Sequence, residues 1–506
     1  MMRVASFLLC LLFVASVACD DIETSPVQSF LETINKWRPV LKDIFGSVYE
    51  TVNRVAFEAA LKEAVNLMDQ AYPAQPPPIV PERWWGENQS NDTSVREFTV
   101  RFTDEMITDL RYRINHRRDF TPALQGVANT YGTNSAFLAQ FLEQWANEYD
   151  FKARERWLNN FPQYVTNIQG LDIHFIHITP PNPRKKVVPI LMLHGFTVTA
   201  FEYVHVIQNL IKERDDSDFE FEIVVPNLPG YGYSEATSKP GLALYQMAII
   251  MKNLMLRLGK EQFYIHAGDI GHMVGDALAT LFPERVLGFH TNLPFSLRPQ
   301  SLTKWVLGQL YPPAVVDARY ESRMYPLLTN LQFYLEHFGY FHIQATKPDN
   351  LGHGPDESPV ALTSWLLEPI MMGTNISSQY FVDGNLTQYY DMNDWFDTFT
   401  VYWSSKSAMT AMRSYAEWLA WKSNPLSYDI MTTPTPVLFA AINFGAEIIY
   451  MPDDLLRDKY PNLVQTTTLD VGGHFAAYLM PDVLANSIWT SVAKMEIVHT
   501  NQAAKS

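Results

Sequence analysis

A candidate nucleophile lies in the stretch FYIHAGDIGHMVG, residues 263–275. An apolar run typical of a buried strand leads into a turn of small residues around Asp269, and a helical pattern follows. Ala267 precedes Asp269 by two residues and Gly271 follows it by two, which is the pattern of a nucleophile elbow, a strained turn that admits only small neighbours. A carboxylate there can attack an alkyl carbon and form an ester that water must open. The alternative is a solvated aspartate at a helix start.

Further residues could complete this chemistry. Opening the ester requires a base that activates water and an acid that holds the base. His474 lies in the loop GGHFAA, after the last predicted strand, and the order nucleophile, acid, histidine is that of the α/β-hydrolases. Glu447 follows the preceding strand and is the candidate acid, with Asp453 and Asp454 as rivals by position alone. A structural histidine is the alternative interpretation of His474.

Buried strands alternate with helical patterns around these residues. This alternation predicts an α/β fold with an α/β-hydrolase core, a mostly parallel sheet with helices on both faces. We expect a helical lid and an N-terminal helical extension in addition to this core. The apolar strands are expected at residues 187–193, 221–225, 263–265, 436–440 and 464–469.

The segment ahead of the core has patterns of its own. Residues 98–102 alternate like a strand, and Thr103 is the expected N-cap of the helix that follows. Residues 161–165 and 171–178 predict a hairpin that enters the sheet. The aromatic-rich stretch 305–421 lacks strands of the core type, which favours a helical lid inserted into the sheet domain.

These patterns divide the chain into six expected units. They are a signal peptide or signal anchor at 1–19, a helical extension and proline-rich linker at 20–83, an N-terminal segment that wraps the core at 84–185, the first part of the core at 186–304, the helical lid at 305–430 and the second part of the core at 431–506.

Composition excludes some functions. The 506 residues carry a formal charge of −16, which argues against a nucleic-acid partner, since such a partner favours a basic face. Both cysteines, Cys10 and Cys19, lie in the N-terminal apolar stretch, so the body has no disulfide, thiol nucleophile or cysteine metal site. No HExxH or similar ligand spacing occurs. We therefore expect hydrolysis without a metal or cofactor.

The first 19 residues predict entry into the secretory pathway. Arg3 precedes an apolar run that ends in small residues, as in a signal peptide cleaved after Ala18 or Cys19. An uncleaved anchor is the alternative and would attach the protein to a membrane, because the run approaches the roughly 20 residues of a membrane span. Either places the body in the endoplasmic reticulum lumen or outside the cell. Four N-x-S/T sequons, which are glycosylated only on the lumenal side of the membrane, are consistent with this location and lie at Asn88, Asn91, Asn375 and Asn385.

From about residue 84 to 489 the sequence resembles the microsomal epoxide hydrolases and the juvenile hormone epoxide hydrolases of arthropods. The resemblance implies hydrolysis of lipophilic epoxides to vicinal diols, with Asp269 as nucleophile and Glu447 and His474 as the pair that activates water. It also implies that Tyr340 and Tyr415 of the lid donate hydrogen bonds to the epoxide oxygen. The strings that carry it are RWWG, NIQGLDIHFIHI, PGYGYSEA, FYIHAGDIG, GYFHIQATKPD and GGHFAA.

Two loops depart from the family pattern. AGDIG stands where the family has GGDWG, and HGFTVT stands for HGWPGS, with Thr197 in place of a proline. Phe196 and Ile270 still supply the backbone N–H groups expected to hold the oxyanion of ester hydrolysis. The departures leave one alternative function, a catalytically impaired carrier or sensor of lipophilic ligands.

Two other hydrolase classes fit less well. A haloalkane dehalogenase typically has an indole N–H beside its aspartate, and Ile270 supplies none. A serine esterase needs GxSxG, whereas GYSEA at residues 232–236 lacks the last glycine. Among epoxides, the aromatic-rich chain favours an apolar substrate, and a terpenoid hormone, an epoxy fatty acid and foreign epoxides all fit.

Overall fold

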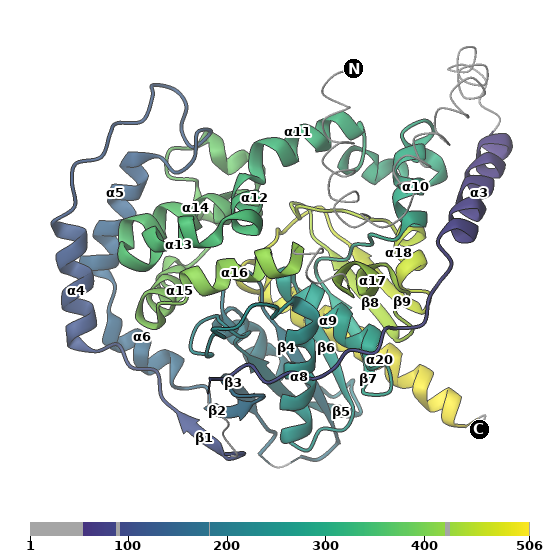
Figure 1. Ribbon diagram of the computed structural model, residues 1–506, viewed down its shortest axis with the longest axis horizontal. Coiled ribbons are helices and arrows are strands. Elements are labelled where there is room, and N and C mark those ends of the chain that lie inside the picture. Colours follow the sequence, from purple (N-terminus) through teal and green to yellow (C-terminus); the bar gives the residue numbers. More distant parts are fainter. Residues whose placement is uncertain (1–53, 88–91, 182, 420–425, 505–506) are drawn as a thin grey trace.

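Figure 1 shows a computed structural model of the chain, which describes residues 54–87, 92–181, 183–419 and 426–504. The predicted signal peptide or anchor at 1–19 and the sequons at Asn88 and Asn91 lie outside these ranges. Over the part that is described, we find no helix with both the length and the apolar character that a membrane crossing requires.

A single nine-stranded sheet runs through the described chain, in the order β1-β2-β3-β5-β4-β6-β7-β8-β9. The first three strands join the sheet through antiparallel pairs, and every pair from β5 to β9 is parallel. This confirms the predicted mostly parallel sheet, including the five core strands. The strands are β1 (Val95–Phe98), β2 (Gln163–Ile168), β3 (Leu171–Ile178), β4 (Lys186–Leu193), β5 (Phe219–Pro226), β6 (Phe263–Ala267), β7 (Val286–Thr291), β8 (Leu438–Asn443) and β9 (Leu463–Thr468).

The strand expected at residues 98–102 is wrong in position. The strand ends at Phe98, and the backbone beyond it bonds to side chains in and directly after helix α6 (Phe151–Leu158) instead of to a neighbouring strand. The amide of Val100 donates to Asn159 Oδ1 at 2.9 Å, and that of Phe102 to Glu155 Oε2 at 2.5 Å. Alternation of apolar residues places Val100 and Phe102 in the core but does not reveal which groups bond the backbone.

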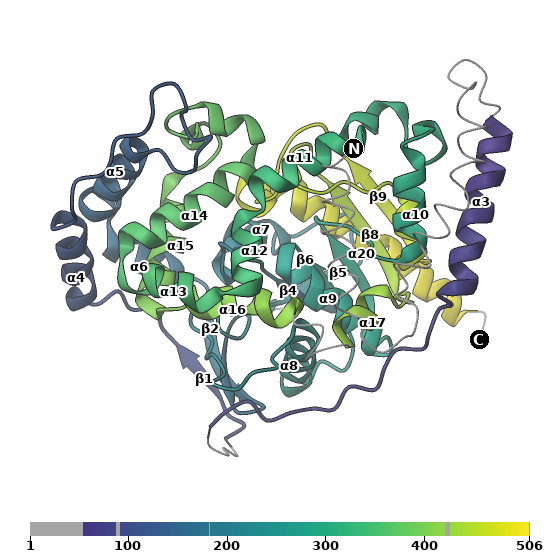
Figure 2. The ribbon, with the colours of Figure 1, turned by 45° about the horizontal axis from the view of Figure 1, so that its top comes forward.

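Helices cover both faces of the sheet (Figures 1 and 2). On one face α8 (Leu244–Arg257) packs against α9 (Asp269–Leu281), and on the other α7 (Val204–Leu210) packs against α20 (Pro481–Ala503). Helix α9 is rich in glycine and alanine, so it can approach the sheet closely: the Cα of Gly275 lies against Ile265 and Phe289. Strand β6 and helix α9 thereby form a rigid support for Asp269.

Between β7 and β8 the chain forms a helical insertion, with no strand among its described residues. It lies beyond the strand ends that carry Asp269, and α12 and α16 supply Tyr340 and Tyr415. Its helical character agrees with the predicted lid. Its helices are α10 (Pro299–Gly308), α11 (Leu327–His337), α12 (Gly339–Thr346), α13 (Pro348–Glu357), α14 (Pro359–Thr374), α15 (Met392–Ser405), α16 (Ala408–Leu419) and α17 (Leu426–Thr432), with short turns η3 (Pro312–Ala314), η4 (Ala318–Arg323), η5 (Ile376–Tyr380) and η6 (Leu386–Gln388).

The N-terminal segment packs on this insertion. Arg154 of α6 forms an ion pair with Asp397 of α15 at 2.5 Å, and Tyr149 donates to the same carboxylate at 2.6 Å. Thr103 accepts from the Met106 amide, which confirms it as the N-cap of α4. The remaining helices are α3 (Arg54–Ala71), α4 (Asp104–Asn115), α5 (Ser135–Glu143), α6 (Phe151–Leu158), α18 (Asp453–Lys459) and α19 (Ala476–Leu479), with η1 (Gln144–Glu148) and η2 (Ala200–Tyr203). The boundaries of the six units stay a prediction.

Candidate active site

Asp269 lies at the sharp turn between β6 and α9. Its φ is +47°, a left-handed conformation that aspartate tolerates better than most residues. The glycines around it are required by close approach: a Cβ on Gly271 would collide with the carbonyl of Leu193, and one on Gly195 would collide with the Asp269 side chain. This geometry is the elbow that the small-residue spacing predicts.

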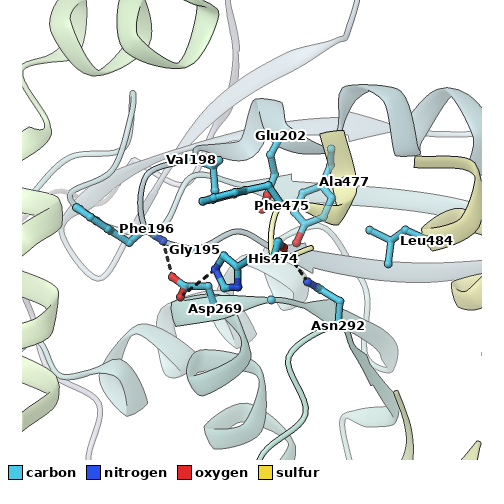
Figure 3. A pocket seen from close by; sticks show the side chains of 12 residues that line it. Gly195, Phe196, Val198, Glu202, Asp269, Asn292, His474, Phe475, Ala477 and Leu484 are labelled. Carbon is cyan, nitrogen blue, oxygen red and sulfur yellow. Dashed lines mark hydrogen bonds and ion pairs between the residues drawn. The ribbon is translucent and has the colours of Figure 1, made fainter. Parts of the chain in front are cut away.

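Backbone amides hold the Asp269 carboxylate. The N–H of Phe196 donates to Oδ1 at 2.7 Å, as Figure 3 shows, and the N–H of Ile270 also bonds to the carboxylate. Burial acts to raise the pKa of Asp269, but His474 and these two amides outweigh it and lower the pKa below its ordinary value of 3.8. The aspartate is therefore ionised at neutral pH, and the amides of Phe196 and Ile270 both bond to it.

His474 lies between two carboxylates. Its Nδ1 bonds to Glu447 Oε1 at 2.6 Å, and its Nε2 is 3.5 Å from Asp269 Oδ2. Burial alone would lower its pKa, but the two carboxylates raise it well above 6.5. The backbone N–H of His474 donates to the carbonyl of Gly373 in α14 at 2.8 Å, so the insertion helps to place the histidine loop.

The structure separates the three candidate acids. Glu447 is buried, and its Oε1 also accepts from the Ile448 amide at 2.8 Å, which fixes the carboxylate towards His474. Asp453 and Asp454 are exposed in the first turn of α18, where Asp454 pairs with Lys304 at 3.3 Å. Glu447 is thus the acid in contact with the histidine.

Tyr340 and Tyr415 reach the same place from the insertion. The ring of Tyr340 stacks on Phe196 at 6.1 Å, and that of Tyr415 meets Phe196 edge-on at 5.4 Å. Burial, and then the charge of Asp269, raise the pKa of both tyrosines well above 10. Both hydroxyls therefore keep their protons at neutral pH and remain hydrogen-bond donors near the carboxylate.

The loop HGFTVT, which differs from the family pattern HGWPGS, still places the Phe196 amide at Asp269. Thr197 has a φ of +69°, which a proline cannot adopt because its ring holds φ near −65°. The loop therefore follows a path of its own, and Thr199 caps the next turn by accepting from Phe201. The Phe196 amide nevertheless points at Asp269, so the sequence departure leaves this part of the site complete.

A small pocket adjoins Asp269 and His474 (Figure 3). Sequence reasoning missed two of its polar side chains, Glu202 and Asn292. Asn292 donates from Nδ2 to the His474 carbonyl at 3.4 Å. The only sequence signal for Glu202 is a single acid inside the apolar run AFEYVHVI. Within the described ranges, no three His, Cys, Asp or Glu side chains gather in a way that would hold a metal ion.

Comparison with known proteins is consistent with this site. Residues 95–203 match the family model "Epoxide hydrolase N terminus", and residues 188–340 match the alpha/beta hydrolase fold. The chain is 43% identical to the juvenile hormone epoxide hydrolase of Manduca sexta, over 84% of this chain and 92% of that one. It is 35% identical to epoxide hydrolase 1 of Oryctolagus cuniculus, over 82% and 92% of the two chains.

A solved structure resembles the fold as well. The crystal structure of juvenile hormone epoxide hydrolase from Bombyx mori is 38% identical and matches with a TM-score of 0.81, covering 83% of this chain and all of that one. Identity at this level over most of both chains shows common family membership. The chain therefore belongs to the α/β-hydrolase-fold epoxide hydrolases, in the family of the microsomal and juvenile hormone enzymes, and it is an epoxide hydrolase.

Proposed function

We propose that this enzyme converts lipophilic epoxides to vicinal diols through a covalent ester on Asp269. The observation that carries the proposal is the carboxylate itself: Oδ1 accepts from the Phe196 amide while Oδ2 faces His474. Asp269 Oδ2 attacks a ring carbon and the carbon–oxygen bond of the epoxide breaks. The hydroxyls of Tyr340 and Tyr415 stabilise the charge that forms on the leaving oxygen, and one of them gives that oxygen the proton that completes the alcohol.

The second half-reaction opens the ester. Once Asp269 is esterified its negative charge is gone, so the pKa of His474 falls and the imidazole can accept a proton from water. The water oxygen bonds to Cγ of Asp269, and the charge that develops on Oδ1 is stabilised by the amides of Phe196 and Ile270. The bond from Cγ to the alkyl oxygen then breaks, and His474 gives its proton to that oxygen, which releases the diol. The second proton of the water leaves the Asp269 carboxyl and restores the tyrosine hydroxyl, so that both groups return to their starting state. Glu447 stabilises the imidazolium throughout.

For the substrate we propose a terpenoid epoxide of the juvenile hormone type. The relatives from Manduca sexta and Bombyx mori are juvenile hormone epoxide hydrolases, at 43% and 38% identity. The aromatic surroundings of Tyr340 and Tyr415 suit an apolar chain. Epoxy fatty acids and foreign epoxides are the other classes to compare, because the rabbit relative is epoxide hydrolase 1.

A panel of epoxides tests this function. Purified protein is incubated with juvenile hormone, an epoxy fatty acid and styrene oxide, and diol formation is followed by mass spectrometry. We expect diol from all three and the highest kcat/KM for the hormone. Tight binding of the epoxides without any diol would instead favour the carrier or sensor alternative.

We also propose that the protein enters the secretory pathway, where it is glycosylated and attached to the membrane through its N-terminus. The apolar run of residues 4–19 supports this proposal, as do the sequons at Asn375 and Asn385, which are both half-exposed. Loss of mass on glycosidase treatment of protein from eukaryotic cells, and release from membranes only by detergent, would test it. A protein without glycans in the soluble fraction would contradict it.

The two tyrosines should act in the first half-reaction. We expect Tyr340→Phe and Tyr415→Phe each to slow formation of the Asp269 ester about 10²-fold, since each removes one donor from the developing oxyanion. Single-turnover rapid quench measures this step directly. Tyr334→Phe, which changes a half-buried tyrosine of α11 outside this cluster, is the control and should leave the rate unchanged. Equal rates in all three variants would contradict the role of the two hydroxyls.

Glu447 should act in the second half-reaction. In Glu447→Gln the neutral amide no longer stabilises the imidazolium, and we expect hydrolysis of the ester to slow by about 10²- to 10⁴-fold. Asp454→Asn removes a carboxylate that was a rival candidate by sequence position and should retain full activity. Steady-state kcat distinguishes the two. A larger loss of kcat in Asp454→Asn than in Glu447→Gln would show that Asp454, and not Glu447, supports the histidine.

A further inference from the structure

Glu202 is a buried carboxyl that the reaction steps above do not use. It lies in η2, directly after the HGFTVT loop, and only 8% of its surface is exposed. Figure 3 shows its side chain directed into the pocket that also contains Asp269 and His474. Burying a carboxyl costs free energy unless its polar atoms find partners, so its position beside the reacting groups requires an explanation.

The pocket is small and has polar atoms on several sides. Its free volume is about 10 Å³, which is room for about one water molecule. Glu202, Tyr203, Asn292, Asp269 and His474 provide the polar groups. A buried water needs two to four such partners. The water of ester hydrolysis must lie within reach of both the His474 imidazole and Cγ of Asp269, and this pocket borders both.

Tyr203 is a partner of Glu202. Its hydroxyl donates to the carbonyl of Leu193 at 3.0 Å and also shares a hydrogen bond with Glu202. This second bond acts to lower the pKa of Glu202, so a neutral Glu202 has to come from the burial of its carboxyl. The side chain is directed into the pocket, where a carboxyl oxygen can accept a hydrogen bond.

The charges around Glu202 favour this neutral form. Burial raises its pKa to about 8, with Asp269 adding to the rise and His474 and Tyr203 opposing it. Tyr402 of α15 and Tyr478 of α19 are the other titratable groups influenced by Glu202, and the pKa of each lies well above 10. At pH 7 the carboxyl is therefore protonated, and above pH 8 it ionises.

We propose that Glu202 is a positioning residue for ester hydrolysis: its carboxyl oxygen holds the water that His474 deprotonates and directs it at Cγ of Asp269. This inference rests on the covalent mechanism proposed above. The water gives its proton to His474 Nε2 while its oxygen bonds to Cγ, and Glu202 keeps its own proton. Loss of the carboxyl should thus slow hydrolysis of the ester and spare its formation.

Two variants test the role. Glu202→Leu removes both oxygens, and Glu202→Gln keeps an acceptor and a donor of similar size. Single-turnover rapid quench with an epoxide that yields diol separates formation of the enzyme ester from its hydrolysis. We expect ester formation within about twofold of wild type in both variants. Hydrolysis should slow at least about tenfold in Glu202→Leu, since a displaced water attacks poorly, and the ester should accumulate. Glu202→Gln should stay within a few-fold of wild type.

The pH profile supplies a readout that a structural role would not change. In the wild type, hydrolysis should slow as the pH rises through about 8 and Glu202 ionises. The new negative charge beside His474 raises the pKa of the imidazole, which then stays protonated and cannot accept the proton of the water. In Glu202→Gln this fall should be absent, since the amide does not ionise. Melting temperatures of both variants show whether they fold.

The outcomes separate the two proposals. Wild-type hydrolysis in Glu202→Leu, or an unchanged fall near pH 8 in Glu202→Gln, would overturn the role of Glu202. Ester formation and hydrolysis slowed by the same factor in both variants would also overturn it, because that result indicates a general distortion of the site. Absence of any enzyme ester in the wild type and in all variants would contradict the covalent mechanism itself.

Discussion

Asp269→Asn is expected to reduce diol formation by at least about 10⁴-fold, the largest effect of any single change in this protein. An amide is a far weaker nucleophile than a carboxylate, and the other carboxyl that lines the pocket, Glu202, is protonated at neutral pH. Asparagine is the right replacement because it has the same shape and tolerates the φ of +47° at this position. Diol formation from the best epoxide of the panel measures the effect.

Two controls make this result specific. The variant should bind an unreactive analogue of the substrate with an affinity within a few-fold of wild type, because the apolar rings of the insertion are untouched. In the wild type, a single turnover in ¹⁸O-labelled water should give unlabelled diol, since the new oxygen comes from Asp269. Label in the first diol would mean that water attacks the epoxide directly, and the ester mechanism would then be wrong.

His474→Gln should produce the second-largest effect, and of a different kind. The two amide bonds to the Asp269 carboxylate persist in this variant, so we expect the epoxide still to be opened. Without a base the ester is not hydrolysed, and we expect one equivalent of adduct per active site with steady-state diol formation reduced at least about 10³-fold. Intact-protein mass spectrometry after epoxide addition measures the adduct, and peptide mapping should place it on Asp269.

An exposed histidine of α12 provides the matched control for this variant. His342→Gln makes the same substitution at the surface next to Tyr340 and should show neither adduct nor loss of turnover. If His474→Gln still formed diol at the wild-type rate, another base would have to serve, and the contact between His474 and Glu447 would have only a structural meaning.

The elbow at Asp269 could be predicted from sequence because its requirements are local. A strained turn between a strand and a helix restricts its neighbours to small side chains, so the chemistry and the geometry appear within the same few residues. The structure confirms the turn, with Gly195 and Gly271 at the points of closest approach. The parallel sheet was predictable for a similar reason, since buried strands separated by helices permit few other arrangements.

The choice of acid was not predictable from spacing. Glu447 lies four residues after β8, and Asp453 and Asp454 lie ten and eleven residues after it. Only the folded loop shows that Glu447 contacts His474 while the two aspartates face solvent. The resemblance to known epoxide hydrolases selected Glu447, as it selected Tyr340 and Tyr415. Residue spacing alone could not have found the tyrosines, because they come from helices far from Asp269 in the sequence.

The sequence by itself predicted Asp269 as the candidate nucleophile, the mostly parallel sheet that carries Asp269 and His474 beyond its strand ends, and the family. Each of these depends on local backbone geometry or on long shared strings of residues. Tertiary structure was needed to show that Glu447 contacts the histidine while its rivals by position do not, how the Thr197 loop places the Phe196 amide at Asp269, and that Glu202 enters the pocket. These features depend on contacts between segments that are distant in the chain. The raised pKa of Glu202 depends on its burial, which its neighbours in the sequence do not indicate.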